Sequence, residues 1–412
     1  MELDLSAAEN IFLGILPNTL GFVSWEKARN MAREVLSRLK VDIDPDDTVR
    51  NLNTSMQQLV CIARALVRNP KVLILDEPTS ALTESETGNL LSILTELKQT
   101  GISCIYISHK LKEVFEISDR IVVLRDAKYV STHFHGKVNS QQVVEDMIGH
   151  RIDAMYPSME GRSISDEVLR VEHFQVQHPN SSAKNIIEDV SFTLRRGEVL
   201  GLAGLVGSGR SELLRAIFGA LPRRDGKVFI NGSERRINST RAAIASGIGF
   251  LTEDRKMDGF VASMNIQENM TLSILRKISQ ATLIRTKTET EKAGHYFNAL
   301  KIKAPSLKTD IINLSGGNQQ KVVLAKSLLT DMKILFLDEP TVGIDVGAKA
   351  EIYKIIKELA ESGISIVMVS SEYPELIAMC DRFIVIANGR IAGELSKAEA
   401  DEAVIIHMAS GL

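Results

Sequence analysis

The same arrangement of motifs occurs twice in this chain, at positions separated by a constant number of residues. In the second half, Leu314-Ser-Gly-Gly-Asn-Gln-Gln320 precedes an apolar run that ends in Asp338-Glu-Pro-Thr341. In the first half, Leu52-Asn-Thr-Ser-Met-Gln-Gln58 precedes a similar run that ends in Asp76-Glu-Pro-Thr79. The offset is 320 − 58 = 262 for one motif and 338 − 76 = 262 for the other. A constant offset across separate motifs indicates a duplicated module, so we expect two related domains.

Length and pattern indicate two α/β domains, the first of them incomplete. The 412 residues allow two or three domains with buried cores. Short Val, Ile and Leu runs alternate with amphipathic patterns, which is typical of a parallel sheet with both faces covered. We expect a partial first domain at 1–150, a polar linker at 151–167, a second domain at 168–395 and a tail at 396–412. In the first domain, helices are predicted at 25–39, 57–68 and 85–98, and strands at 71–75, 103–108 and 121–124.

The composition narrows the partners and the compartment. A net charge of −3 gives no support for a nucleic-acid partner, which usually requires a basic excess or stripe. Cys61, Cys104 and Cys380 form no disulfide framework and suit a reducing cytoplasm. No apolar run reaches the roughly 18 residues of a membrane span, and the acidic residues 1–5 are unlike a signal peptide. We therefore expect any membrane role to be peripheral, through another chain.

A glycine-rich loop, Gly204-Leu-Val-Gly-Ser-Gly-Arg-Ser211, follows an apolar strand pattern and opens a helical one. Glycines in this context let backbone amides point at an anion, and the helix N-terminus adds partial positive charge. The predicted nucleotide-binding residues are Gly204, Gly207, Ser208, Gly209, Arg210 and Ser211, and Ser211 is also a predicted metal ligand. Arg210 replaces the usual lysine and Glu212 adds an anion, so we expect phosphate binding without fast hydrolysis.

An Asp-Glu pair ends an apolar strand pattern in each copy of the module. Asp76 and Asp338 are suited to hold Mg²⁺ through water, and the adjacent Glu77 and Glu339 to orient or deprotonate an attacking water. A solvated pair at a strand end is the alternative. The following Pro-Thr and the preceding motif favour the catalytic interpretation.

The segment that begins at Leu314 is predicted to start a helix whose first amides bind a γ-phosphate presented by an opposing module. The predicted contacts are Ser315, Gly316, Gly317 and Gln319. The first copy has Asn53-Thr-Ser55 at the corresponding place and lacks both glycines, and the added Cβ atoms restrict the approach of a phosphate. A purely structural helix start is the alternative for that copy.

The offset also predicts that the chain starts inside its first module. Arg210 would have its counterpart at 210 − 262 = −52, before Met1. The part expected to be missing would hold the loop-bearing strand and an antiparallel face, so the first domain should expose a strand edge and apolar surface. We expect the first domain to be the less stable one.

Together these motifs resemble the ATP-binding cassette, an α/β P-loop NTPase domain, in tandem and with the first copy incomplete. The details resemble bacterial sugar-import ATPases with two fused cassettes, which serve ribose, galactose, arabinose or xylose permeases. The resemblance covers essentially the whole chain and rests on Gly-Arg-Ser-Glu212, Thr252-Glu-Asp-Arg-Lys256, the Leu314 motif, Asp345-Val-Gly-Ala-Lys349 and Ser370-Ser-Glu-Tyr-Pro-Glu375. Glu172-His173, His178-Pro179 and Cys104-Ile-Tyr-Ile-Ser-His-Lys-Leu111 favour the xylose type.

The resemblance implies further roles for particular residues. His109 lies 109 − 76 = 33 residues after Asp76, as the catalytic switch histidine of a cassette does, and the second copy has Ser371 there. Glu253 occupies the place of a glutamine that binds Mg²⁺ and senses the membrane partner. Residues 257–272 would form the face that docks on the transmembrane permease subunits, with an ordinary surface loop as the alternative.

In this family two composite sites form where the modules face each other, and each site holds ATP and Mg²⁺. The resemblance implies an ATP-binding subunit at the cytoplasmic face of the cell membrane, peripheral to the permease and served by a periplasmic sugar-binding protein. Because the loop of the stronger site is missing from the sequence, we expect this polypeptide to hydrolyse ATP poorly or not at all. The alternatives are an inactive remnant, a binding-only protein, or a soluble tandem-cassette protein without a permease.

Overall fold

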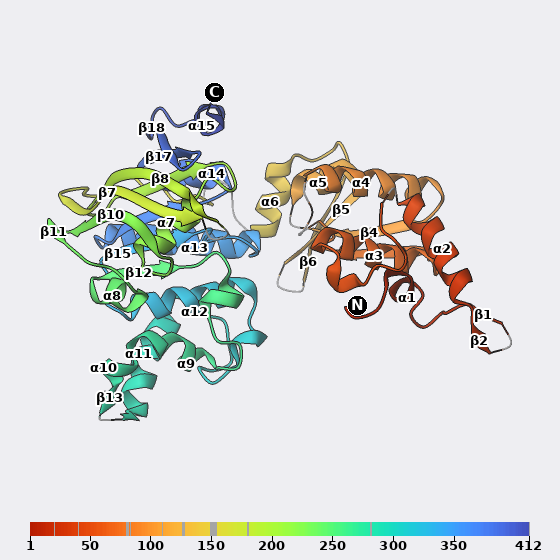
Figure 1. Ribbon diagram of the computed structural model, residues 1–412, viewed down its shortest axis with the longest axis horizontal. Helices are drawn as coiled ribbons and strands as arrows, with labels where there is room; N and C mark the ends of the chain where they lie inside the picture. Colours follow the sequence, from red (N-terminus) through yellow and green to blue (C-terminus); the bar gives the residue numbers. More distant parts are fainter. Residues whose placement is uncertain are drawn as a thin grey trace. The chain divides into compact units, whose positions relative to one another are not determined.

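The structure, a computed structural model, describes residues 1–19, 21–39, 41–79, 82, 84–108, 110–125, 128–148, 155–178, 181–280 and 282–411 (Figure 1). The chain divides into two compact units, Met1–Met147 (unit 1) and Ile148–Leu412 (unit 2). Each unit contains its own clusters of buried hydrophobic side chains. The predicted domain limits and linker remain predictions. Within the described residues, no helix combines the length and the apolar composition needed to cross a bilayer.

Unit 1 combines helices with three small two-stranded sheets. Its helices are α1 (Ala7–Ile11), α2 (Trp25–Arg38), η1 (Val49–Asn51), α3 (Thr54–Leu66), α4 (Glu84–Gln99), α5 (Leu111–Ile117) and α6 (Ser140–Ile148), which ends at the unit boundary. Its strands are β1 (Asn18–Thr19), β2 (Phe22–Val23), β3 (Val72–Asp76), β4 (Ser103–Ile107), β5 (Arg120–Arg125) and β6 (Lys128–Phe134). β3 pairs with β4 in parallel, whereas β1–β2 and β5–β6 are antiparallel hairpins.

Unit 2 is built on a ten-stranded sheet with the order β11-β10-β7-β8-β18-β17-β9-β16-β15-β12. The strands are β7 (Glu167–His178), β8 (Ser181–Arg195), β9 (Val199–Gly204), β10 (Arg223–Ile230), β11 (Ser233–Glu234), β12 (Ile248–Leu251), β15 (Ile334–Asp338), β16 (Ser365–Val369), β17 (Arg382–Ala387) and β18 (Arg390–Ser396), with a separate hairpin of β13 (Ser279–Gln280) and β14 (Leu283–Ile284). The helices are α7 (Arg210–Ile217), α8 (Thr240–Ala245), the π-turn η3 (Arg255–Gly259), α9 (Ile266–Thr271), η4 (Leu272–Ile274), α10 (Leu275–Ile278), α11 (Thr286–Ala299), η5 (Ile311–Asn313), α12 (Gly316–Leu328), α13 (Val346–Glu361), α14 (Tyr373–Met379) and α15 (Glu402–Ser410).

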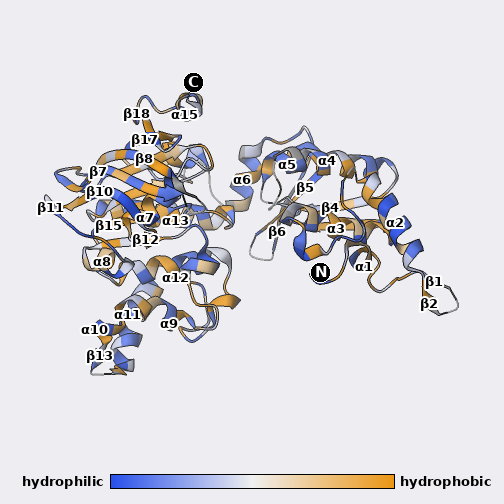
Figure 2. Cartoon of the chain, in the orientation of Figure 1, coloured by the Kyte–Doolittle hydropathy of each residue, from blue (hydrophilic) through white to orange (hydrophobic). Residues whose placement is uncertain are grey.

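The centre of this sheet is parallel, as predicted for the α/β fold. β9 lies between β16 and β17, and β15 and β12 extend the parallel part beyond β16. β9, β15 and β16 are buried at every residue, which is expected for parallel strands covered on both faces. Because side chains alternate along a strand, Leu335 and Leu337 join one cluster with α12 and α13, while Phe336 joins the other with β7, β8 and α7. The apolar strands and the mixed character of the covering helices can be followed in Figure 2.

The duplication inferred from the motifs extends to the elements themselves. The elements from η1 to α6 recur as η5 to α15, and each start and end is shifted by 262 residues; β3 and β15, for example, begin at 72 and 334. Backbone detail recurs as well, since Glu77 and Glu339 have positive φ angles of 47° and 48°. Non-glycine residues seldom adopt such angles, so the two strand ends share one unusual turn.

Apolar side chains are exposed on two of the small sheets of unit 1. In the β3–β4 sheet, Val72, Ile74 and Ile107 are 52%, 64% and 47% exposed, and in the β5–β6 hairpin Leu124 is 67% exposed. The expectation of exposed apolar surface is therefore confirmed, and the expectation of a sheet covered on both faces is wrong for this unit. In unit 2 the corresponding face packs against β7, β8, β10 and α7, and the described residues of unit 1 contain no such layer.

Sequence patterns located six of the longer elements of unit 1 to within three residues at each end. They missed the helices α1, η1, α5 and α6, the two-residue strands of the β1–β2 hairpin and the strand β6. Part of the predicted linker packs against unit 2: Met159 is 5% exposed within its core, and the Arg162 guanidinium pairs with the Asp381 carboxylate at 2.6 Å. Polar and proline-containing composition therefore did not imply a free segment here.

Candidate functional site

The predicted phosphate loop connects the end of β9 to the start of α7. Gly209 is the residue before α7 and has a φ of 96°, a conformation that L side chains rarely adopt. A Cβ atom at Gly209 would lie 2.7 Å from the Ile187 side chain, and one at Gly204 would lie 2.5 Å from the Ile386 carbonyl oxygen. Both glycines are thus required by the path of the loop. The loop also lies at the carboxyl end of a central parallel strand, where α/β sheets bind ligands.

Two side chains of this loop have surroundings that suit an anion. The Ser208 hydroxyl is buried and has no hydrogen-bond partner among the described residues. A buried hydroxyl without a partner is costly, and such groups commonly mark a ligand position. Arg210 is 6% exposed, and its guanidinium donates to the Ser370 carbonyl oxygen at 3.0 Å. This hydrogen bond holds the positively charged Arg210 side chain at the residue that follows β16.

Ser211 and Asp338 lie side by side. The Ser211 hydroxyl donates to a carboxylate oxygen of Asp338 at 2.7 Å, and Asp338 is 1% exposed at the end of β15. Burial raises the pKa of Asp338 to about 7, the Ser211 hydrogen bond lowers it, and the charges of Glu253 and Glu339 raise it further. The surroundings thus disfavour a free carboxylate, and a bound cation would reverse that preference.

Glu339 stands next to Asp338 in the unusual turn described above. Its amide donates to the Val369 carbonyl oxygen at 3.0 Å, and its carboxylate accepts a hydrogen bond from the Ser371 hydroxyl at 3.0 Å. Ser371, which occupies the switch-histidine position of the second copy, therefore orients Glu339. It carries no imidazole that could move a proton.

Glu253 belongs to the same acidic group although it follows a different strand, β12. Burial raises its pKa, and the charges of Glu339 and Glu212 act in the same direction, whereas Arg215 opposes them. The site therefore gathers Glu253, Asp338 and Glu339 around the loop of residues 204–211. Carboxylates next to a phosphate-binding loop would repel the phosphates of a ligand. A cation bound between the carboxylates and the phosphates would remove that repulsion.

The predicted signature residues form a second cluster in unit 2, at the start of α12. A Cβ atom at Gly316 would lie 2.8 Å from the Arg255 guanidinium, and one at Gly317 would lie 2.4 Å from the Cβ atom of Ala348. Ser315 precedes the helix, and its hydroxyl accepts a hydrogen bond from the side-chain amide of Asn318 at 2.9 Å. Among the described residues, no hydrogen bond links this cluster to residues 204–211.

Arg255, which the sequence reasoning quoted only within a family motif, organises that cluster. Its guanidinium donates to the carbonyl oxygens of Val342 and Gly343 at 2.7 and 2.8 Å and contacts the Gln319 side-chain oxygen at 3.4 Å. Burial lowers the pKa of Arg255. The guanidinium thereby joins the turn η3 to the start of α12 and to the loop that follows Glu339.

Unit 1 holds the remaining predicted residues. Asp76 ends β3, and the amide of Glu77 donates to the Ile107 carbonyl oxygen at 2.9 Å, as the amide of Glu339 does to Val369 in unit 2. Ser55 stands where Gly317 stands in unit 2, and its hydroxyl donates to Glu86 at 3.0 Å. The predicted catalytic residue His109 lies outside the described residues. The roles of these residues and the composite sites remain predictions.

The sequence reasoning did not assign a role to a buried carboxyl group beside the site. Glu375 is 1% exposed and accepts hydrogen bonds from the hydroxyls of Thr341, at 2.9 Å, and Ser370. The duplication carried a usable signal, because Thr79 and Glu113 occupy the corresponding positions of unit 1 and form the same contact at 2.6 Å. Pairs retained across both copies would have pointed to this network.

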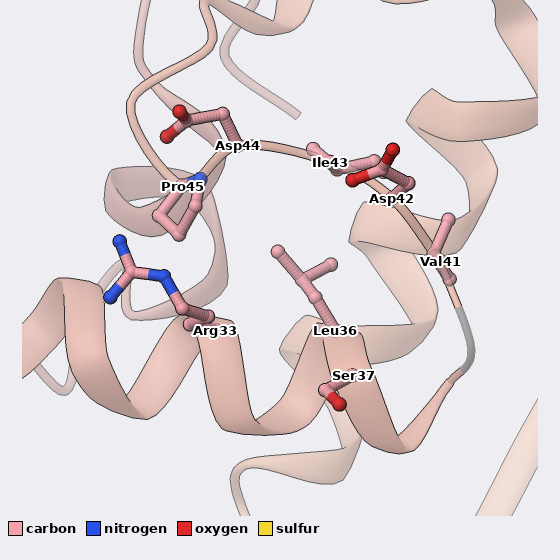
Figure 3. Close-up of a pocket in the computed structure, with 8 residues that line it drawn as sticks. All are labelled: Arg33, Leu36, Ser37, Val41, Asp42, Ile43, Asp44 and Pro45. Atoms are coloured by element: carbon pink, nitrogen blue, oxygen red, sulfur yellow. The ribbon is translucent and has the colours of Figure 1, made fainter.

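A cavity of about 500 Å³ opens on unit 1 beside α2 (Figure 3). It is lined by Arg33, Leu36, Ser37, Val41, Asp42, Ile43, Asp44 and Pro45. None of the predicted site residues lines it, so it does not bear on the nucleotide-binding prediction.

A strand that ends in a glycine loop at a helix start, with a buried aspartate at the end of a nearby parallel strand, defines a P-loop nucleotide-binding protein. The ABC transporter family matches residues 2–80 and 187–342. The chain therefore belongs to the ABC transporter family, whose ATP-binding subunits hydrolyse ATP.

The relatives agree with the predicted resemblance. The chain is 45% identical to the xylose import ATP-binding protein XylG of Thermoanaerobacter pseudethanolicus over 99% of this chain and 81% of the relative. It is 43% identical to the ribose import ATP-binding protein RbsA of Geobacillus kaustophilus, with the same coverage of each chain. A solved nucleotide-free ATP-binding cassette from an ABC transporter matches with a TM-score of 0.50 and 22% identity, over 58% of this chain and 94% of that one. This last likeness concerns the fold alone.

Proposed function

We propose that unit 2 binds the triphosphate of ATP at residues 204–211. The observation that carries this proposal is the buried Ser208 hydroxyl, which has no partner among the described residues and lies in a glycine loop at the start of α7. The loop amides and the helix N-terminus supply donors for phosphate oxygens. Arg210 supplies positive charge at the same place, and its contact with the Ser370 carbonyl fixes where that charge lies.

Ser211 and Asp338 are the proposed ligands of Mg²⁺, with Glu253 close by. Mg²⁺ prefers oxygen ligands and commonly takes one or two carboxylates together with substrate phosphates and water, so these side chains fit it. When bound, the ion would neutralise charge on the phosphates. Glu339 is proposed to hold the attacking water, since the hydrogen bond from Ser371 fixes its carboxylate.

The proposed physiological role is that of an ATP-binding subunit that energises import of a monosaccharide, with xylose the first sugar to test. Its partners would be transmembrane permease subunits and, through them, a periplasmic sugar-binding protein. The chain would lie peripherally on the cytoplasmic face of the cell membrane. Within residues 257–272, the exposed apolar side chains are Met257, Val261 and Leu272, which are 80%, 37% and 36% exposed, whereas Ile266 and Met270 are buried. We propose the exposed three as part of the permease contact.

Calorimetric titration of the purified chain with ATP, with and without Mg²⁺, tests the site. Ser211→Ala should weaken binding of magnesium ATP by about tenfold and leave magnesium-free ATP less affected, because the hydroxyl contacts the ion. Ser233→Ala, an exposed serine on β11, is the matched control. Failure of the parent protein to bind ATP, or equal behaviour of the two variants, would contradict the proposal.

Sugar uptake tests the physiological role. Deleting the gene from its source organism should reduce uptake of labelled xylose, and uptake of labelled ribose should be followed in parallel. Unchanged uptake of both sugars would remove the support for a transport role while leaving the nucleotide site untouched.

A second candidate function is nucleotide binding by unit 2 with little turnover. Two observations favour it: Arg210 is committed to the Ser370 carbonyl, and Ser371 replaces a histidine beside Glu339. A planar guanidinium does not substitute freely for a point-like ammonium. Phosphate release measured at saturating ATP separates the candidates, and Arg210→Lys should raise turnover if the arginine limits it.

A further inference from the structure

The buried carboxyl group of Glu375 has no assigned role in the site as proposed. It lies in the first turn of α14 and is 1% exposed. Its two oxygens accept hydrogen bonds from different loops, one from Thr341 at 2.9 Å and the other from Ser370. Both donors are themselves buried, with exposures of 2% and 0%. Burying a carboxyl group is costly unless hydrogen bonds offset the lost hydration, and two hydroxyl donors do so here.

The two loops that Glu375 joins are the loops that present the proposed chemistry. Thr341 follows Glu339 by two residues, on the turn after β15. Ser370 precedes Ser371, whose hydroxyl donates to Glu339 at 3.0 Å. One oxygen of Glu375 therefore holds the turn that contains Glu339, and the other holds the segment whose Ser371 donates to Glu339.

The same carboxyl group also reaches the phosphate loop. The Ser370 backbone carbonyl accepts the hydrogen bond from Arg210 at 3.0 Å, while the Ser370 hydroxyl donates to Glu375 and accepts from the Glu372 amide at 3.0 Å. Ser370 is therefore held at three points. A shift of Ser370 would move the acceptor on which the Arg210 guanidinium rests.

We propose that Glu375 is a positioning residue of the nucleotide site in unit 2, which sets Arg210 and Glu339 through Ser370 and Thr341. This inference rests on the proposed nucleotide-binding function and deepens it. Glu375 touches neither phosphate nor water in this account and acts only through its two hydroxyl partners. The Thr79–Glu113 contact at 2.6 Å is the equivalent arrangement in the other copy of the module.

Nucleotide affinity measured well below the unfolding temperature tests the proposal. Glu375→Ala removes the acceptor of two buried hydroxyl donors and should weaken ATP binding by about tenfold, measured without Mg²⁺ and at one fixed pH. Glu375→Gln retains one acceptor and should recover part of the loss. Thr341→Val removes a single contact and should weaken binding about fivefold. Glu358→Gln, on an exposed position of α13, is the matched control and should bind as the parent does.

A double-mutant cycle identifies the route of the effect. If Glu375 acts through Arg210, the losses caused by Glu375→Ala and Arg210→Ala should be less than additive in affinity, because both remove one function. Thr341→Val serves in the same cycle if Glu375→Ala does not fold. A lowered melting temperature with unchanged affinity, or strictly additive losses, would show a merely structural role and overturn the inference. Absence of ATP binding by the parent protein would instead overturn the proposed function and the inference with it.

Discussion

Units 1 and 2 each contain a buried glutamate that accepts a hydrogen bond from a threonine. The pKa values of the two carboxyl groups are nevertheless shifted in opposite directions. Burial raises the pKa of Glu113, but hydrogen bonds from Thr79 and Tyr106 and the charge of Lys110 outweigh it, so the pKa is lowered overall. Burial raises the pKa of Glu375 to about 7, and Glu372 raises it further against the hydrogen bonds of its partners. Lys110 and Glu372 occupy corresponding positions (372 − 110 = 262). Both units therefore keep the contact, while burial, the Tyr106 hydroxyl and the exchange of Lys110 for Glu372 shift the pKa values of the two carboxyl groups in opposite directions.

The two units also differ in how well the faces of their sheets are covered. In unit 2 both faces of β15 are covered, while in unit 1 the face of β3 that carries Ile74 is exposed. The backbone register of β15 on β16 matches that of β3 on β4 residue for residue. The hydrogen-bonded frame is thus common to both units, and the packing around it is not.

The largest expected effect compares equivalent positions on these faces. Phe336→Ala should lower the free energy of unfolding of unit 2 by about 3–5 kcal/mol, because it leaves a cavity in a fully buried core. Ile74→Ala, at the equivalent position of unit 1, should cost less than about 0.5 kcal/mol because the side chain is 64% exposed. Denaturant unfolding followed by hydrogen exchange in β15 and β3 measures each loss. Equal losses would show that the face of β3 is covered in solution.

The next largest effect is an opposite response of the units to acid. Asp338 and Glu375 have folded-state pKa values of about 7, above those of unfolded carboxyls, so the native state retains protons that the unfolded chain loses as pH rises from about 4 to 7. Unit 2 should therefore lose stability across that window, on the order of 2–4 kcal/mol. Glu113 has a lowered pKa, so its contribution to unit 1 is present above the ordinary carboxyl pKa and is lost as pH falls through the folded value.

Hydrogen exchange of both units at about pH 5.5 and about pH 8, corrected for intrinsic rates, measures the loss in unit 2, and unit 1 should show little slope there because the pKa of Glu113 lies below this window. A variant with Asp338→Asn and Glu375→Gln should flatten the response of unit 2 and leave unit 1 unchanged. Parallel slopes in the two units of the parent protein would contradict the difference in charge state.

A smaller effect concerns the helix starts at α3 and α12. Gly317→Ser introduces the residue that unit 1 carries at position 55, and its Cβ atom would meet Ala348 at 2.4 Å, so we expect a loss of about 1–3 kcal/mol from overpacking. Adding Ala348→Gly should relieve the contact, less about 0.5–1 kcal/mol for a glycine in a helix. Urea unfolding of both variants measures the recovery. If Gly317→Ser left the free energy of unfolding unchanged, α12 and α13 could separate at little cost. The packing difference from unit 1 would then be minor.

Much of this organisation could be predicted from the sequence because it depends on spacing and periodicity. The constant offset predicted the duplication, and the strand–glycine–helix pattern predicted the loop at residues 204–211. The contacts that complete the site join residues far apart in the chain, and spacing carries no information about them. Arg210 meets a carbonyl 160 residues away, and Glu375 gathers hydroxyls from two loops.

The predicted linker shows the same limit. Composition indicated a polar linker, but it carried no information on the pairing of Arg162 with Asp381 or on the packing of Met159 in the core of unit 2. Those partners become visible only once β17 and its neighbours have been placed. The short hairpins could not be predicted for a different reason, because two-residue strands are too short to show a hydrophobic period.

The smallest expected effect returns to the helix starts and concerns capping. The Asn53 side chain accepts a hydrogen bond from the Met56 amide at 2.8 Å and so caps α3. Ser315, its counterpart in unit 2, makes no capping hydrogen bond among the described residues. Asn53→Ala should therefore destabilise unit 1 by about 1 kcal/mol, while Ser315→Ala should change the stability of unit 2 by less than about 0.5 kcal/mol.

Thermal unfolding of the two variants measures this difference. A helix start whose side-chain hydroxyl does not cap leaves its first backbone amides for a ligand, as predicted for nucleotide at the start of α12, and the Ser315 hydroxyl can still donate while it accepts from the Asn318 side chain. The capped start of α3 uses its side chain for stability instead. If Ser315→Ala proved as costly as Asn53→Ala, Ser315 would be a structural cap, and the reading of α12 as the ligand-binding copy would lose its physical basis.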